Sequence, residues 1–420
     1  MPGPQPRPSS HLTMPFLCLP LPAPRLETPD PMRATLTLLC CLLALAPLGA
    51  VEPDPHQKLY DEAGRVFSDL EAHPLPAPNP DQDTEAELLR AMAHGDRTID
   101  LAFYRRLDLD AVTDRLLPAL DSSFSRENVG GQMATCRLFL VRGHKLCLEG
   151  KVAEGQGWLL KAHRMARRPN GDGNLLRLLT AIALENMALA ADGAYIGAWS
   201  EPDRLAYVRA LEALPPVAGV RRAVLLDDLS LDEPTRFRTL LPLLKPLNSA
   251  QRREKLVATW SLVRGFEPEF LRCYEGMVDN LTPASWDALL LQVADGLEPL
   301  NLDKLRAFEA RVTAAAAFAR DPTNAPNAPT TPLQKGEAFY LSLLGSSIQL
   351  IARHRLDLDL KTQLLKVALR RGAGFDAADL VGLSSVNHGP LKLGIDETSQ
   401  RQAIKGGDRD ECFLPLGRRR

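Results

Sequence analysis

Apolar residues recur every three or four positions from Thr84 onward, and this spacing places them on one face of an α-helix. Alternation of apolar and polar residues, the pattern of a half-buried strand, is nearly absent. Leucine and alanine are abundant and aromatic residues are few, as expected for helices packed through small side chains. The pattern predicts an all-α fold. Its expected helices cover residues 84–93, 98–106, 111–120, 133–149, 152–167, 174–191, 202–213, 219–227, 233–243, 249–263, 267–279, 283–297, 302–319, 334–354 and 359–371.

Stretches rich in proline and glycine divide the chain. Residues 321–332 combine four prolines with Asp, Asn and Thr, the composition of an exposed linker, and helical spacing fades after Gly372. The predicted organisation is a disordered or untranslated leader (1–31), a signal peptide or signal anchor (32–50), a Pro-rich linker with a short helix (51–83), a helical-hairpin domain (84–320), a linker (321–332), C-terminal helices (333–378) and an irregular tail (379–420).

Residues 32–50 have the pattern of an export signal. Arg33 precedes an apolar run, and the run ends in small residues around Gly49 and Ala50. The uncharged stretch is barely long enough for a bilayer core of about 30 Å, so we favour a cleaved signal and a mature chain that begins near Val51. The alternative is an uncleaved helix over residues 34–50 that tethers the protein to a membrane. Both place the chain outside the cytoplasm.

A four-residue motif recurs at expected helix starts, and its last residue is always aspartate. That aspartate is expected to accept hydrogen bonds from the first turn, while the leucine before it packs on the same turn. We favour this capping role over a metal site built from paired aspartates. The four copies span residues 107–110, 229–232, 300–303 and 356–359.

Residues 136–169 form the clearest unit of the chain. Small and large residues alternate there at the spacing of a helical hairpin whose two helices approach closely. The residues that carry the pattern are Phe139, Gly143, Leu146, Gly150, Gly155, Leu159 and Ala162. This spacing resembles a tetratricopeptide repeat, although Arg142 stands where leucine is usual and Pro169 comes late. The resemblance implies stacked helical hairpins, and the predicted architecture is an irregular α-solenoid.

The near-zero net charge and the lack of cofactor motifs narrow the function classes. The formal net charge is −2, so no nucleic-acid footprint or polybasic membrane patch is expected. Neither a Gly-rich phosphate loop nor a dinucleotide fingerprint is present in the sequence, and no cofactor is predicted.

Two places carry weak candidates for metal ligands. His144 and Cys147 lie one turn apart on an expected helix, a possible ligand pair that lacks a second pair. In the tail, the carboxylates of Asp408 and Asp410 could ligate calcium. We favour ordinary packing for the first pair and a surface loop for the second.

Glu185 is the weak catalytic candidate, because it interrupts an otherwise apolar helix. A buried carboxylate can have a raised pKa and act as a general acid. The basic group His163, Arg164, Arg167 and Arg168 ends the preceding helix, where cations suit the negative helix pole; an anion-binding patch is the alternative.

The preferred function is therefore an exported, non-catalytic binding or scaffolding protein of the cell envelope, whose partner is a protein or peptide. The alternatives are an envelope hydrolase that uses a buried carboxylate, and a membrane-tethered interaction protein. Glu185 in a polar cleft beside a second carboxylate would favour the hydrolase. Glu185 bonded to an arginine in a sealed core would argue against it.

Overall fold

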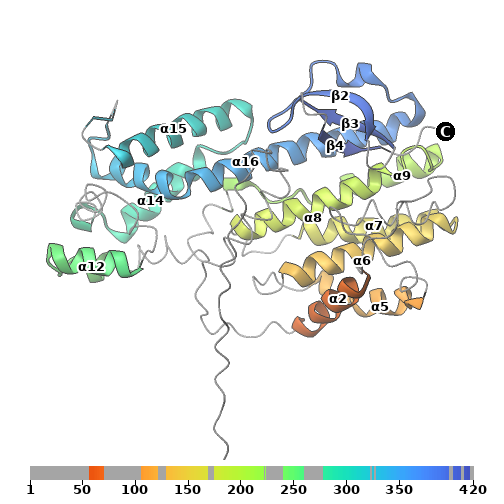
Figure 1. The fold of residues 1–420 in the computed structure, drawn as a ribbon, viewed down its shortest axis with the longest axis horizontal. Helices are drawn as coiled ribbons and strands as arrows, with labels where there is room; N and C mark the ends of the chain where they lie inside the picture. The colour runs from red at the N-terminus through yellow and green to blue at the C-terminus, as the bar shows by residue number, and fades with distance from the viewer. Residues whose placement is uncertain are drawn as a thin grey trace, which may run out of the picture. The chain divides into compact units, whose positions relative to one another are not determined.

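The computed structural model describes residues 56–70, 106–121, 129–168, 175–221, 223, 240–259, 278–321, 324–325, 328–396, 401–407 and 411–416 (Figure 1). The chain divides into two units, Met1–Leu45 and Ala46–Arg420, and every described residue belongs to the second. The predicted leader (1–31) and signal segment (32–50) lie outside the described residues. None of the described helices is both long and apolar enough to cross a membrane.

The chain is mostly helical, as the apolar periodicity predicts. The described α-helices are α2 (Gln57–Leu70), α5 (Leu109–Arg115), α6 (Val129–Leu148), α7 (Val152–Ala166), α8 (Leu175–Gly193), α9 (Glu201–Glu212), α12 (Ser249–Thr259), α14 (Pro283–Asp295), α15 (Leu302–Arg320) and α16 (Pro332–Arg371). Short 3-10 turns are η1 (Leu117–Leu120), η4 (Gly372–Gly374) and η5 (Ala377–Leu380).

Helices α6 and α7 form a tight hairpin within residues 136–169. Gly150, at φ +80°, ends α6 in the left-handed conformation that glycine tolerates best. A Cβ added to Gly155 would lie 2.7 Å from the carbonyl oxygen of Gly143, so the two helices touch through their backbones. Arg142, which departs from the repeat pattern, lies over the Trp158 ring at 3.9 Å and pairs with Asp110 of α5.

Other helices pack around this hairpin. The short helix expected within residues 51–83 is present as α2, and it packs on α6 through the buried side chains of Tyr60, Ala63 and Phe67. On the other side, α7 packs against α8. Residues on nearly every face of α8 are buried. Three layers of helix therefore follow one another in the order α2, α6–α7 and α8.

Helix α16 is a single helix of 40 residues that packs on α8, α9, α14 and α15 (Figure 1). The sequence predicted two helices here, 334–354 and 359–371, because residues 356–359 carry the capping motif. That division is wrong: Leu358 is buried within the helix, and Asp359, the expected cap, lies inside the helix, where it pairs with Arg355. Asp357 accepts a hydrogen bond from Val386 N. Helices on both sides of residues 321–332 thus contribute to one unit.

The capping motif acts through its second residue. Asp108 accepts from Ala111 N at 3.0 Å, and Asn301 accepts from Lys304 N at 2.9 Å. The expected caps, Asp110 and Asp303, instead lie in the first turns of α5 and α15. There an acidic side chain suits the helix N-terminus without closing it. The copy at 229–232 lies outside the described residues.

The C-terminal region corrects the all-α prediction. In place of an irregular tail over residues 379–420, a four-stranded antiparallel sheet in the order β1-β2-β3-β4 follows α16. The strands are β1 (Ser384–Ser385), β2 (Gly389–Asp396), β3 (Arg401–Gly406) and β4 (Glu411–Pro415). Ladder pairs such as Leu393↔Ile404 join β2 to β3, and β4 packs against α8 and α16. Glycine and proline residues interrupt this segment, so the short alternation of Leu391, Leu393 and Ile395 did not predict a strand.

Candidate functional site

A sealed polar network connects α7, α8 and α9. His163 Nδ1 lies 3.0 Å from Glu185 Oε1, and His163 Nε2 lies 2.8 Å from Asp192 Oδ2. Arg167 donates to Glu185 Oε1 from Nε at 2.8 Å and also from Nη2. The Tyr207 hydroxyl donates to Asp192 Oδ1 at 2.7 Å. We call these five residues the ion network.

Burial seals the ion network from solvent. His163, Glu185 and Asp192 are all 0% exposed, and Tyr207 is 1% exposed. The spacing explains how the network forms, because His163 and Arg167 are one turn apart on α7, while Glu185 and Asp192 are two turns apart on α8. One helix thus presents two cations to two anions on the next. Among the described residues, Glu185 Oε2 has no hydrogen-bond partner.

The electrostatics keep Glu185 ionised. Burial alone would raise the pKa of its carboxyl, but His163 and Arg167 outweigh burial and lower that pKa to about 2. Burial likewise opposes charge on His163, yet the carboxylates of Glu185 and Asp192 raise the pKa of His163 to about 9. A general acid must carry a proton near its working pH. This arginine-bonded, sealed and ionised carboxylate does not suit a general acid.

The two metal candidates on α6 are occupied by other contacts. His144 is 1% exposed, and its Nδ1 is hydrogen-bonded to the Tyr195 hydroxyl. Burial raises the pKa of the Cys147 thiol to about 12, which disfavours the thiolate that zinc binds. In the part of the chain that the structure describes, no cluster of three His, Cys, Asp or Glu residues could hold a metal ion. Asp408 and Asp410 lie outside the described residues.

Two residues of the basic group at the end of α7, Arg167 and Arg168, form hydrogen bonds within the protein. Arg167 belongs to the ion network, and its Nη1 also donates to the Leu211 carbonyl at 3.3 Å. Arg168 donates from Nη2 to the Ala119 carbonyl. These two guanidinium groups hold α7 to α9 and to η1, so they serve the packing of helix ends.

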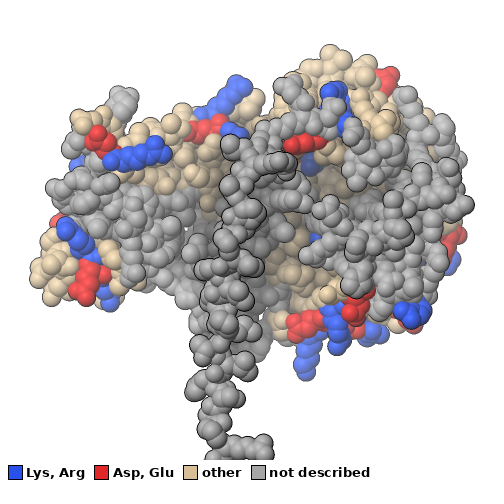
Figure 2. Space-filling model, viewed as in Figure 1, with Lys and Arg blue, Asp and Glu red and all other residues tan. Residues whose placement is uncertain are grey.

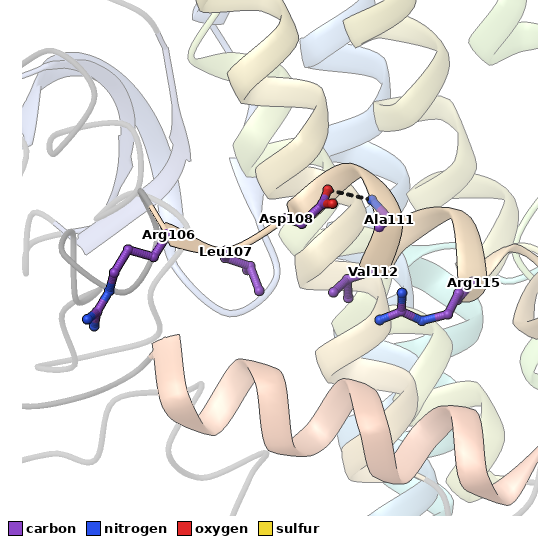
Figure 3. Close-up of a pocket in the computed structure, with 6 residues that line it drawn as sticks. All are labelled: Arg106, Leu107, Asp108, Ala111, Val112 and Arg115. Atoms are coloured by element: carbon purple, nitrogen blue, oxygen red, sulfur yellow. Dashed lines mark hydrogen bonds between the residues drawn. The ribbon is translucent and has the colours of Figure 1, made fainter.

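A pocket of about 420 Å³ opens at the start of α5. It is lined by Arg106, Leu107, Asp108, Ala111, Val112 and Arg115. Asp108 is engaged in capping the helix, as the dashed line in Figure 3 shows. The Leu107, Val112 and Arg115 side chains point to the same side of the segment (Figure 3). The Arg115 guanidinium beside the apolar carbons of Leu107 and Val112 suits a ligand that carries both a carboxylate and an apolar group (Figure 3).

A second polar cluster, which the sequence did not predict, joins α16 to the β1–β2 loop, and we call it the α16–loop cluster. The Asp357 carboxylate accepts from Val386 N at 2.9 Å, from Asn387 N at 3.3 Å and from Asn387 Nδ2 at 2.7 Å. His388 Nδ1 lies 3.0 Å from Glu411 Oε2. Burial lowers the pKa of Lys361, whose Nζ donates to Asn186 Oδ1 at 3.0 Å. In the sequence, Asp357 stands out only as part of the motif copy at 356–359, which was predicted to begin a helix.

Charge is mixed on the surface that can be described. On the face drawn in Figure 2, Lys and Arg atoms lie beside Asp and Glu atoms in each visible cluster. This agrees with the near-zero net charge and gives no preference for a polyanion.

No protein-family model matches the chain, and the comparisons with curated proteins and with solved structures find no match either.

Proposed function

We propose that the chain is an exported helical protein of the cell envelope that binds a protein or peptide partner and carries out no catalysis. The observation that carries this proposal is the contrast between the ion network and the pocket at α5. The ion network is sealed and its charges neutralise one another, whereas the pocket at α5 is open and carries exposed guanidinium groups. The first suits internal stiffening and the second suits binding.

The pocket chemistry favours a partner segment that combines an acidic and an apolar side chain. Arg115 pairs with Glu62 of α2 at 2.7 Å, with side chains 53% and 23% exposed respectively. Ion pairs as exposed as this contribute about 1 kcal/mol or less, so a partner carboxylate can replace Glu62 at little cost. Leu107 and Val112 offer apolar contact beside it.

The architecture that we infer is a stack of helical hairpins of tetratricopeptide type. The backbone contact between Gly143 and Gly155 supports it, as do the successive contacts of α6 with α7 and of α7 with α8. Such stacks commonly present one face to a peptide or protein partner. Residues 136–169 are the one unit whose spacing carries the resemblance.

Site-specific photo-crosslinking tests the binding function. A benzophenone amino acid at Ala111, which lines the pocket, should crosslink a partner in an envelope extract, and Arg115→Glu should abolish that product. The same probe at Glu254 on α12, an exposed position outside the pocket, is the matched control. Equal labelling at both positions, or labelling that Arg115→Glu leaves unchanged, would refute a pocket-specific partner.

Export has its own test. We propose that residues 32–50 are a cleaved signal, so N-terminal sequencing of protein from the envelope fraction should find a chain that begins near Val51. An intact 34–50 segment on membrane-bound protein would favour the tethered alternative. Recovery of the intact segment on cytosolic protein would contradict export altogether.

A further inference from the structure

The Lys361 amine lies where α8, α16 and β4 come together. Lys361 extends from α16, and its Nζ donates to Asn186 Oδ1 of α8 at 3.0 Å. The same Nζ lies over the Phe413 ring of β4, 4.9 Å from the ring centre. Strand β4 packs against both helices (Figure 1), and the Lys361 side chain is half-buried among them.

Neither contact of this amine supplies an opposite charge. Asp357 precedes Lys361 by one turn of α16, but its carboxylate accepts from N–H groups of the β1–β2 loop. The Asn186 amide is neutral, and its Nδ2 donates to the Ile182 carbonyl at 2.9 Å, which leaves Oδ1 to accept from the lysine. Within the described ranges, Lys361 forms no ion pair. Lysines that are removed from water are usually paired with an acid.

This setting favours the neutral form of the Lys361 amine. Burial lowers its pKa, and this effect outweighs the opposing charges of Asp357 and Cys412. A neutral amine still has an N–H to donate to Asn186 Oδ1. It also has the nitrogen lone pair that an ammonium group lacks, and this lone pair makes a desolvated lysine a nucleophile.

The other titratable groups on the neighbouring elements have partners or charge states of their own. On α16, burial lowers the pKa of His354 to about 4, so its imidazole is neutral at pH 7. His388 Nδ1 pairs with Glu411 Oε2 of β4, and the His388 ring packs against the Phe413 ring with centroids 5.6 Å apart. None of these groups forms a hydrogen bond with Lys361. The amine is therefore held by one amide and one aromatic ring.

We propose that Lys361 is a nucleophilic amine that condenses reversibly with a small aldehyde. The Nζ lone pair forms a bond to the carbonyl carbon, the C=O π electrons move to oxygen, and one amine proton moves to that oxygen. The resulting carbinolamine loses its hydroxyl group and the second amine proton as water while a C=N bond forms. One amine and one aldehyde thus give one imine and one water, without an oxidant or a reductant.

The surroundings of the amine favour a short aliphatic aldehyde. The Phe413 ring against Nζ offers apolar contact to an alkyl chain, and Asn186 holds the amine in place. A half-buried side chain leaves little room for a bulky carbonyl compound. The inference does not depend on the pocket at α5 or on the proposed partner.

Reductive trapping of the purified chain tests the proposal. Propanal is added with cyanoborohydride at pH 7, so that any imine is fixed as a propyl amine, and the labelled lysines are mapped by peptide mass spectrometry. We expect Lys361 to be labelled about tenfold faster than the exposed Lys58. The rate at Lys361 should reach half its maximum below the pH of about 10.4 that is ordinary for a lysine amine. Lys361→Arg should remove the fast-labelled product, whereas Lys366→Arg, on the same helix, should not.

Two variants of Asn186 separate the chemistry of the amine from its accessibility. Asn186→Asp sets a carboxylate against Nζ and should slow labelling of Lys361 at pH 7 about tenfold, because the ammonium form is then favoured. Asn186→Leu, of similar size but without charge, should leave the labelling fast. Labelling of Lys361 no faster than that of Lys58 would overturn the proposal. An equal rate in the Asp and Leu variants would overturn it as well.

Discussion

The ion network and the α16–loop cluster solve the same problem in different ways. In the ion network, the carboxylates of Glu185 and Asp192 face the cations of His163 and Arg167 between neighbouring helices. In the α16–loop cluster, the Asp357 carboxylate faces backbone and amide N–H groups of a loop far along the chain. A buried carboxylate therefore needs donors, and these can be cationic side chains or the N–H groups of a loop. The first arrangement couples the stability of the fold to charge balance, whereas the second anchors a local segment.

The largest expected effect is the loss of Glu185 from the ion network. Glu185→Gln removes the carboxylate and leaves the Arg167 cation buried without its anion, while His163 keeps Asp192 as its partner. We expect a loss of about 3–5 kcal/mol in the free energy of unfolding, measured by chemical denaturation. The double variant Glu185→Leu/Arg167→Met, which removes one charge of each sign, should lose much less. A single variant as stable as the wild type would mean that the network contributes nothing to stability.

The pH dependence tests the same network without removing its anion. The pKa of His163 is raised from 6.5 to about 9 on folding, so its stabilisation is complete below pH 6.5 and is lost as the pH rises toward 9. Burial also raises the pKa of Asp192 above 3.8, so the stability linked to that carboxyl is lost as the pH rises above 3.8. We expect the wild type to lose about 3 kcal/mol between pH 6 and pH 9.

His163→Gln provides the control for this titration. The variant should be less stable than the wild type near pH 6 but should show little further change up to pH 9. An equally steep loss in the variant would assign the titration to another group. In acid the sign reverses for Glu185, whose pKa falls from 4.5 to about 2 on folding, so its stabilisation is lost as the pH falls toward 2.

The α16–loop cluster should respond locally. Asp357→Ala removes the acceptor of the Val386 N–H and of the Asn387 side-chain amide, and hydrogen bonds to a charged group contribute about 1.5–3 kcal/mol. We expect faster hydrogen exchange in residues 384–396 and unchanged exchange in α6, α7 and α8. Asp359→Ala is the matched control, because the Asp359 side chain is 57% exposed and pairs only with Arg355 among the described residues. Equal effects of the two variants would contradict an anchoring role for Asp357.

The smallest expected effects concern the hairpin on which the ion network is built. A Cβ at Gly143 would lie 2.9 Å from Leu159 Cδ2 and 3.1 Å from the Gly155 carbonyl oxygen, so Gly143→Ala should cost about 1–2 kcal/mol. Gly157→Ala, on α7 with open space around it, should stabilise the chain by up to about 1 kcal/mol. Thermal unfolding should separate the two signs, and a neutral Gly143→Ala would contradict close backbone contact.

Parts of the α6–α7 hairpin and of the ion network could be predicted from the sequence. The spacing of Gly143 and Gly155 predicted a hairpin, and the interruption of an apolar helix marked Glu185 as unusual. Its partners could not be predicted, because which face of α7 meets α8 depends on packing and not on spacing along one helix. The motif copy at 356–359 was predicted to begin a helix with Asp359 as its cap, whereas Asp357 accepts hydrogen bonds from a loop about 30 residues further along the chain.

The sequence by itself determined that most of this chain is helical, because 3.6-residue periodicity is a local property of neighbouring residues. Only the tertiary structure decided that α16 continues through residues 356–359 and that the residues after it form a sheet. Both outcomes depend on contacts between distant segments: Asp357 is satisfied by the β1–β2 loop, and β4 is covered by α8 and α16. Strands this short gain stability from their neighbours, and those neighbours are not adjacent in sequence.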